Sequence, residues 1–182
     1  MNEKAKTGDL FIVDNSVSGW TALRYLEEWC EIAKSMDIAT GFFEIGSLLA
    51  LDGKWQQLEK VRILMGDEIT KRTKKALLDS IKDKSKEKLD DSIEDDKDKN
   101  PFLTGVDAIV DALKTGQIEC RVYNKNKFHA KTYIIHAKQE VVGAQALVGS
   151  SNFTLPGLTD NVELNIRIQV ASEVRQLQEW YE

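Results

Sequence analysis

The chain has 182 residues, a length that predicts one domain large enough to bury a hydrophobic core. Two prolines and 11 glycines exclude collagen-like and Pro/Gly-rich disordered classes, and two cysteines exclude a disulfide scaffold. The formal net charge of -5 argues against indiscriminate adhesion to nucleic acids or membranes. The N-terminus does not resemble a signal peptide, and the longest uncharged run is interrupted by glycines and a proline. We therefore expect a soluble, cytoplasmic protein that does not enter the membrane.

Strand-like and helix-like segments alternate in the first third of the chain. We expect strands over 10–13, 37–43 and 61–65, and helices over 18–36 and 45–58. Gly41 interrupts an otherwise bulky strand, which indicates that another segment approaches the backbone there. The alternation is typical of an α/β fold with parallel strands and right-handed crossovers.

A highly charged segment separates this part from the rest. Lys, Asp and Glu supply 15 of the 21 residues from 79 to 99, so we expect 79–100 to be either a solvated helix or an insertion. The segments after it predict a helix, four strands and a final helix, over 102–114, 117–123, 128–136, 140–149, 161–170 and 171–182. The final helix has no capping signal, which suggests that the protein continues beyond it.

The short run around His129 is the strongest candidate for catalysis. His129 and Lys131 are two residues apart in a predicted strand, so their side chains lie on the same face. An ammonium group beside an imidazole favours the neutral imidazole, which can act as a nucleophile. The pair can also bind an oxyanion.

A second motif follows the next predicted strand. Gly149 permits close backbone approach, while Ser150 and Asn152 offer small neutral donors suited to phosphate oxygens. Eleven residues later, Glu163 could accept a hydrogen bond from His129 and fix its tautomer. Glu163 could equally be an edge-strand charge that discourages aggregation.

Together these motifs resemble the phospholipase D superfamily, specifically its single-motif nuclease branch and the phospholipase D-like domains of bacterial restriction-type helicases. The resemblance implies that residues 1–182 form one α/β/α sandwich with a mixed, largely parallel sheet. It also implies a phosphodiesterase that needs neither metal nor cofactor and forms a phosphohistidine. His129 would attack phosphorus, Glu163 would orient the imidazole, and the phosphate oxygens would be held by Lys131, Ser150 and Asn152. Because the chain has one motif copy, the resemblance implies a homodimer that joins two sites.

His136 stands where the superfamily pattern has Asp. Strand alternation puts position 136 on the face opposite His129, and we expect a solvent-facing side chain at the strand end. The spacer before Gly149 is also longer than in compact members, which suggests a hairpin around 137–140.

Basic residues surround the motif, with no carboxylate between Cys120 and Gln139. They could form a solvated hairpin, but their clustering slightly favours a track for a polyanion, to which Gly149 would add its backbone. The four cations of this track besides Lys131 are Arg121, Lys125, Lys127 and Lys138. Basic surroundings favour a nuclease acting on DNA over a lipase.

Two other interpretations remain open. The chain could be a catalytically weakened module that binds phosphate or DNA and dimerises beside a C-terminal helicase or ATPase portion. It could also be a purely structural domain. Trp180 and Tyr181 are candidates for a docking surface, whereas the core is expected to hold Trp20, Trp29 and Trp55.

Overall fold

The structure is a computed structural model that describes residues 10–17, 19–69, 73, 74, 77, 101–140 and 142–182. The charged segment 79–100 lies outside the described residues. Within them, one seven-stranded sheet has the order β1-β7-β6-β5-β2-β3-β4. The strands are β1 (Ile12–Val13), β2 (Ala33–Phe43), β3 (Lys60–Ile69), β4 (Ile118–Val122), β5 (Lys131–Ala137), β6 (Gln145–Gly149) and β7 (Asn165–Ile168).

The sheet is mixed, as expected, but most of the described strand pairings are antiparallel, so the sheet is not largely parallel. Strands β2, β3 and β4 are parallel, whereas β5, β6, β7 and β1 each pair antiparallel with a neighbour. The expectation that 10–13 joins the parallel group is wrong, because β1 is a two-residue edge strand that pairs with β7.

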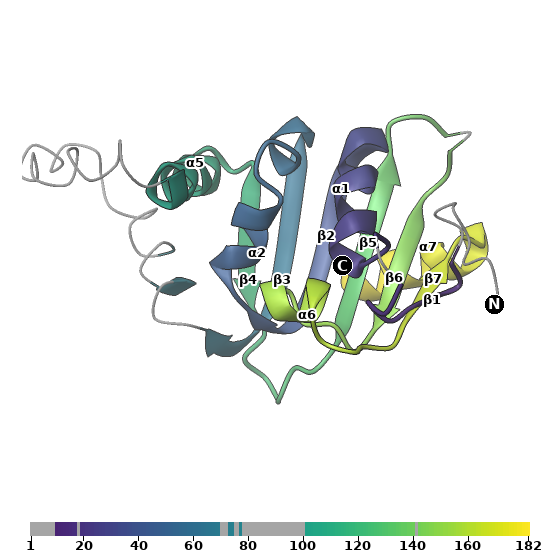
Figure 1. The fold of residues 1–182 in the computed structure, drawn as a ribbon. Coiled ribbons are helices and arrows are strands. Elements are labelled where there is room, and N and C mark those ends of the chain that lie inside the picture. Colours follow the sequence, from purple (N-terminus) through teal and green to yellow (C-terminus); the bar gives the residue numbers. More distant parts are fainter. Residues whose placement is uncertain (1–9, 18, 70–72, 75–76, 78–100, 141) are drawn as a thin grey trace, which may run out of the picture.

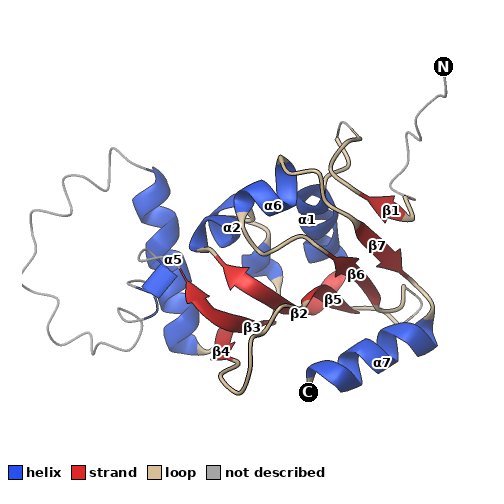
Figure 2. Ribbon diagram, turned by 90° about the horizontal axis from the view of Figure 1, so that it is seen from below, coloured by secondary structure: helices blue, strands red, loops and turns tan. Residues whose placement is uncertain are grey.

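Helices cover both faces of the sheet (Figure 1). They are α1 (Ala22–Ile32), α2 (Ile45–Ala50), the 3₁₀ helix η1 (Trp55–Gln57), α5 (Pro101–Thr115), α6 (Leu155–Thr159) and α7 (Ala171–Tyr181). Figure 2 shows α1, α2, α5 and α6 on one side of the sheet and α7 on the other. This α/β layering confirms the predicted fold class. None of the described helices combines the length and the apolar character that a membrane span requires.

Each face has its own hydrophobic core. The larger core joins α1 to the sheet through residues such as Leu26, Tyr133 and Leu147. The smaller core lies under α7 and contains Ile134 and Val174. Tyr133 and Ile134 are neighbours on β5, so strand alternation sends their side chains into different cores.

Local signals explain where the helices begin and end. The α1 helix begins after Thr21, whose side chain accepts a hydrogen bond from the Arg24 N–H, and it ends where Ala33 enters β2. It is therefore shorter than the predicted 18–36. Gly53 adopts a positive φ of 74°, which separates α2 from η1. Gly116, at φ 78°, directly follows α5 and ends it.

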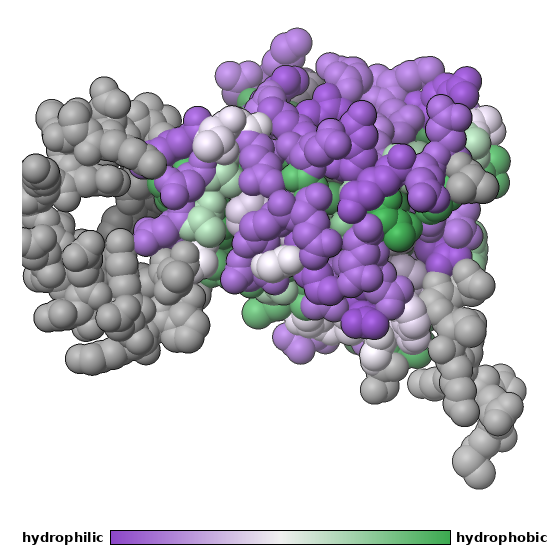
Figure 3. Space-filling model, turned by 90° about the horizontal axis from the view of Figure 1, so that it is seen from above, coloured by the Kyte–Doolittle hydropathy of each residue, from purple (hydrophilic) through white to green (hydrophobic). Residues whose placement is uncertain are grey.

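The two ends of the sheet differ. Viewed from the top of Figure 1, the surface is mostly hydrophilic, with only small apolar areas (Figure 3). At the lower end of Figure 1, the loops after β2 and β6 meet the segment before β5. An isolated bridge between Phe43 and Phe153 joins two of these segments. The predicted catalytic residues lie at this lower end.

Candidate active site

His129 lies in the loop just before β5, rather than inside a strand as predicted, and Lys131 is the first residue of β5. Nζ of Lys131 lies 2.9 Å from Nδ1 of His129 and donates to the His129 carbonyl oxygen, also at 2.9 Å. The two side chains therefore share one side of the backbone, as their spacing predicts.

The two members of this pair differ in solvent exposure. Lys131 is only 7% exposed, whereas His129 is exposed. Burial lowers the pKa of the Lys131 ammonium, and the nearby carboxylate of Glu163 opposes this shift. The pair thus presents an accessible imidazole backed by a buried cation.

Asn152 is held in one orientation by β2. The backbone N–H of Phe42 donates to Oδ1 of Asn152 at 3.0 Å, and Oγ1 of Thr40 lies 3.5 Å from the same oxygen. A backbone N–H can only donate, so it fixes which atom of the amide is the oxygen. The Nδ2 group of Asn152 is therefore left as a donor for a ligand.

Asn152 contacts β2 beyond Thr40, the last residue of β2 that pairs with β5. The pairing with β3 shifts register between Thr40 and Phe42, so the ladder is interrupted at Gly41. A Cβ atom at Gly41 would lie 3.1 Å from the Phe128 carbonyl oxygen and 3.3 Å from Cα of His129. Gly41 thus accounts for the close approach that its position predicts. Thr40 and Phe42 carried no sequence signal of their own.

Glu163 contacts the second motif. Oγ of Ser150 donates to Oε2 of Glu163 and accepts from the Leu164 N–H at 2.9 Å. Asn161 donates to the other carboxylate oxygen at 3.4 Å. Among the described residues, Glu163 therefore bonds Ser150 and Asn161, and not His129, although it lies close enough to influence Lys131.

Two residues shape the loop that carries Ser150 and Asn152. A Cβ atom at Gly149 would lie 2.1 Å from the Leu164 carbonyl oxygen, so only glycine fits between β6 and β7. Asn165 is 1% exposed; its Nδ2 donates to Ser151 Oγ at 2.8 Å and to the Val13 carbonyl oxygen at 2.9 Å. Asn165 was missed because a buried amide in a short strand has no distinctive spacing.

The predicted basic track is only partly assembled. Lys125 and Lys127 are exposed in the loop between β4 and β5 and form no ion pair with any described residue. Arg121 instead pairs with Glu119, at 2.6 Å from Nη2 to Oε1. Lys138 lies beyond the opposite end of β5, where it donates to the Glu31 carbonyl oxygen at 3.1 Å.

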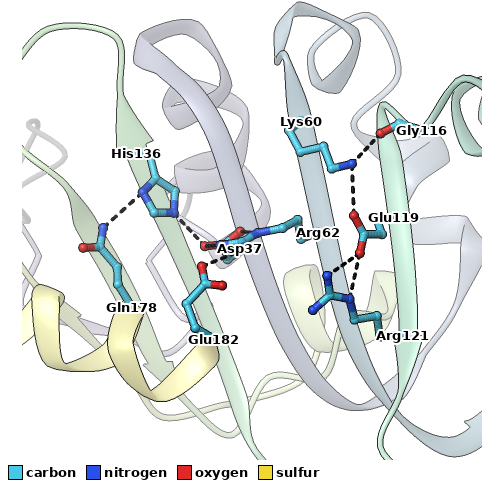
Figure 4. Close-up of polar contacts among 9 residues, drawn as sticks. All are labelled: Asp37, Lys60, Arg62, Gly116, Glu119, Arg121, His136, Gln178 and Glu182. Carbon is cyan, nitrogen blue, oxygen red and sulfur yellow. Dashed lines mark hydrogen bonds and ion pairs between the residues drawn. The ribbon is translucent and has the colours of Figure 1, made fainter.

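His136 is not the solvent-facing residue that we expected. Its Nε2 lies 2.6 Å from Oδ2 of Asp37, and its Nδ1 lies 3.2 Å from Nε2 of Gln178 on α7 (Figure 4). His136 is partly covered because β2 places the buried carboxylate of Asp37 diagonally across from it, while α7 packs over the same face. This face is opposite to the one that carries His129 and Lys131, as strand alternation predicts.

No three His, Cys, Asp or Glu side chains gather as a metal site within the part of the chain that the structure describes. The family model for the cardiolipin synthase, PLD-like domain matches residues 31–182. The chain belongs to this family of PLD-like domains. The resemblance of the sequence to the phospholipase D superfamily is thereby confirmed.

Solved structures share the fold of this chain. The PLD-like chain is similar to the phospholipase D family member Nuc from Salmonella typhimurium, with 14% identity, a TM-score of 0.53, and coverage of 93% of this chain and 89% of Nuc. It is also similar to NucT from Helicobacter pylori, with 14% identity, a TM-score of 0.51, and coverage of 88% of this chain and 84% of NucT. The similarity to yeast tyrosyl-DNA phosphodiesterase has 12% identity and a TM-score of 0.52, and it covers 87% of this chain and 31% of the yeast protein. No curated protein matches by sequence. The fold is thus shared with these structures.

Proposed function

We propose that this PLD-like domain is a phosphodiesterase, and more specifically a nuclease that cleaves DNA through a phosphohistidine. The observation that carries the proposal is the meeting of an exposed imidazole, a buried ammonium and an oriented amide donor at one end of the sheet. A nucleophile beside fixed donors for the non-bridging oxygens is what phosphoryl transfer requires.

In the proposed first step, Nε2 of His129 attacks phosphorus. A P–N bond forms while the bond between phosphorus and the leaving oxygen breaks, and a second imidazole protonates that oxygen. Water then attacks the phosphohistidine, returns a proton to the second imidazole and releases His129. The ammonium of Lys131 and the Nδ2 group of Asn152 hold the non-bridging oxygens throughout.

The contact between Lys131 and His129 bears on the tautomer. When the ammonium donates into Nδ1, the neutral ring carries its proton on Nε2, so Nε2 has no lone pair in the ring plane with which to attack phosphorus. The attacking ring needs its proton on Nδ1 instead. We infer that phosphate draws Lys131 away from Nδ1, which can then donate to Glu163.

The second imidazole would come from a second copy of the chain. An exposed apolar row beside Glu163 supports such a homodimer, because exposed apolar patches often mark contacts between proteins. The row consists of Ile12 (48% exposed), Val162 (86%), Leu164 (58%) and Ile166 (38%). Glu163 lies between Val162 and Leu164 in the sequence, so we expect a contact through these two residues to bring the two sites near each other.

One observation favours the other candidate, a module that binds phosphate or DNA without turnover. Ser150, a predicted phosphate donor, donates its hydrogen bond to Glu163, the predicted orienting carboxylate. In this arrangement the two side chains satisfy each other instead of contacting phosphate and His129. Attachment to a helicase or ATPase stays a prediction of the sequence.

The His129→Ala variant tests the proposal. His129 is exposed, so its removal should leave the unfolding temperature unchanged while abolishing cleavage of a model phosphodiester. Full activity in this variant would contradict the proposal. Phosphate binding without any cleavage by the wild-type chain would favour the binding module.

A further inference from the structure

In the loop between β4 and β5, two aromatic residues flank two lysines just before His129. Lys125 and Lys127 are exposed, and they stand between Tyr123 and Phe128 in the sequence. The rings of Tyr123 and Phe128 contact each other, with centroids 5.2 Å apart and planes inclined by 34°. This loop thus combines cations with aromatic surface beside the proposed nucleophile.

Trp180 near the end of α7 extends the aromatic cluster. Its ring stacks on Phe128, with centroids 6.4 Å apart and an interplanar angle of only 13°. Figure 2 shows this end of α7 and the β4–β5 loop on the same side of the sheet. Trp180 is nevertheless 53% exposed. We call Tyr123, Phe128 and Trp180 the aromatic platform.

The charges around the aromatic platform favour an anionic partner. Lys125 and Lys127 form no ion pair with any residue that the structure describes. Arg62 pairs with both Asp37 and Glu182, so one cation offsets two carboxylates, and Glu179 is a further exposed carboxylate next to Trp180. The net positive charge of this surface therefore comes from Lys125 and Lys127. Exposed aromatic surface beside unpaired cations is the combination that binds single-stranded nucleic acid, whose bases stack while its phosphates meet the cations.

We propose that the aromatic platform and the two lysines bind single-stranded nucleic acid, with one base stacked on Trp180 and the adjoining phosphates on Lys125 and Lys127. In a duplex the bases are already stacked on each other, so the platform favours single strands over duplexes. That the bound strand is also the substrate rests on the proposed function, because Phe128 of the platform directly precedes His129.

Binding is tested on the full chain in the His129→Ala background, so that cleavage cannot interfere. The probe is a fluorescein-labelled oligothymidylate of about 12 nucleotides, compared with a duplex of equal length by fluorescence anisotropy. We expect Trp180→Ala to weaken single-strand binding about tenfold, to leave duplex binding unchanged, and Trp180→Phe to restore most of the loss. Lys125→Gln with Lys127→Gln should weaken both.

Lys34→Gln is the matched control, because Lys34 is exposed at the opposite end of β2 and should not affect binding. The unlabelled oligothymidylate should also quench tryptophan fluorescence, and Trp180→Phe should remove this quenching while binding remains. Unchanged single-strand binding by Trp180→Ala, or equal losses for single strand and duplex, would overturn the proposal. Single-strand binding through Trp180 by a chain that cleaves nothing would contradict the proposed function instead.

Discussion

Nε2 of His136 and Oδ2 of Asp37 lie 2.6 Å apart on the sheet face opposite the candidate site. Asp37 is 1% exposed and also receives two hydrogen bonds from Arg62, from Nε at 2.6 Å and from Nη2 at 2.7 Å. The superfamily pattern has a carboxylate at position 136, and here the neighbouring strand supplies one to the imidazole that replaces it. The histidine at position 136 therefore has a buried partner of its own and makes no contact with His129.

The first prediction concerns the stability of this network. Asp37→Ala should lower the free energy of unfolding by about 3–5 kcal/mol, because it leaves Arg62 and His136 without their shared buried partner. Glu119→Ala is the control, since Glu119 lies on the same face but forms exposed ion pairs and should cost at most about 1 kcal/mol. Denaturant unfolding of both variants measures the difference, and equal losses would contradict the buried network.

The network should also respond to acid. Burial alone would raise the pKa of the Asp37 carboxyl, but hydrogen bonds from His136 and Arg62 outweigh it and hold the pKa below its ordinary value. A lowered pKa stabilises the fold above the unfolded value of about 4, and this contribution is lost as pH falls through the folded value. The stability gap between the wild type and Asp37→Asn should therefore shrink as the pH falls below about 4. A gap that widens below about pH 4 would contradict a lowered pKa for Asp37.

Gly41 provides a test of how the site is positioned. A methyl group there would press on the Phe128 carbonyl oxygen and on Cα of His129, so Gly41→Ala should slow cleavage about 10- to 100-fold. Gly46→Ala is the matched control: a Cβ atom at this helical position meets nothing within 4 Å. It should leave the rate unchanged and stabilise the fold by up to about 1 kcal/mol. Steady-state rates and unfolding temperatures of the two variants decide, and an unaffected rate for Gly41→Ala would remove Gly41 from the account.

The pH profile of cleavage should report Lys131. Because burial lowers the pKa of its ammonium, activity should fall on the alkaline side at a lower pH than an ordinary lysine would give. Glu163 opposes this shift, so Glu163→Gln should move the alkaline limb to still lower pH. Lys131→Arg should lower the rate but abolish the limb, since arginine stays protonated. A limb that persists unchanged in Lys131→Arg would assign it to another group.

The sequence predicted much of the fold because the strongest signals were local. Periodic apolar residues located α1, α5 and α7, and Gly116 marked the end of α5. The pairing of β1 with β7 could not be predicted, since a contact between chain positions so far apart leaves no mark in a two-residue strand. The network of Asp37, Arg62 and His136 was missed for a similar reason, because Asp37 and His136 are 99 residues apart in the sequence.

In the candidate site, too, local features were predicted and long-range contacts were not. The two-residue spacing of His129 and Lys131 predicted side chains on one face of a strand; in the structure His129 lies just before β5, and the two side chains are in contact. The orientation of Asn152 depends on the Phe42 N–H, which lies beyond the last pairing of β2 with β5. A backbone donor at the end of a strand pairing has no signature in side-chain identity.

The central claim is that His129 forms a covalent bond to phosphorus. The most direct test incubates the full chain with a model phosphodiester, quenches the reaction early and maps phosphorylation by mass spectrometry. We predict an acid-labile phosphoryl group on His129, retained in His136→Asn and absent from His129→Ala. Steady cleavage with no phosphoryl group on His129, or with the group on His136, would contradict the account.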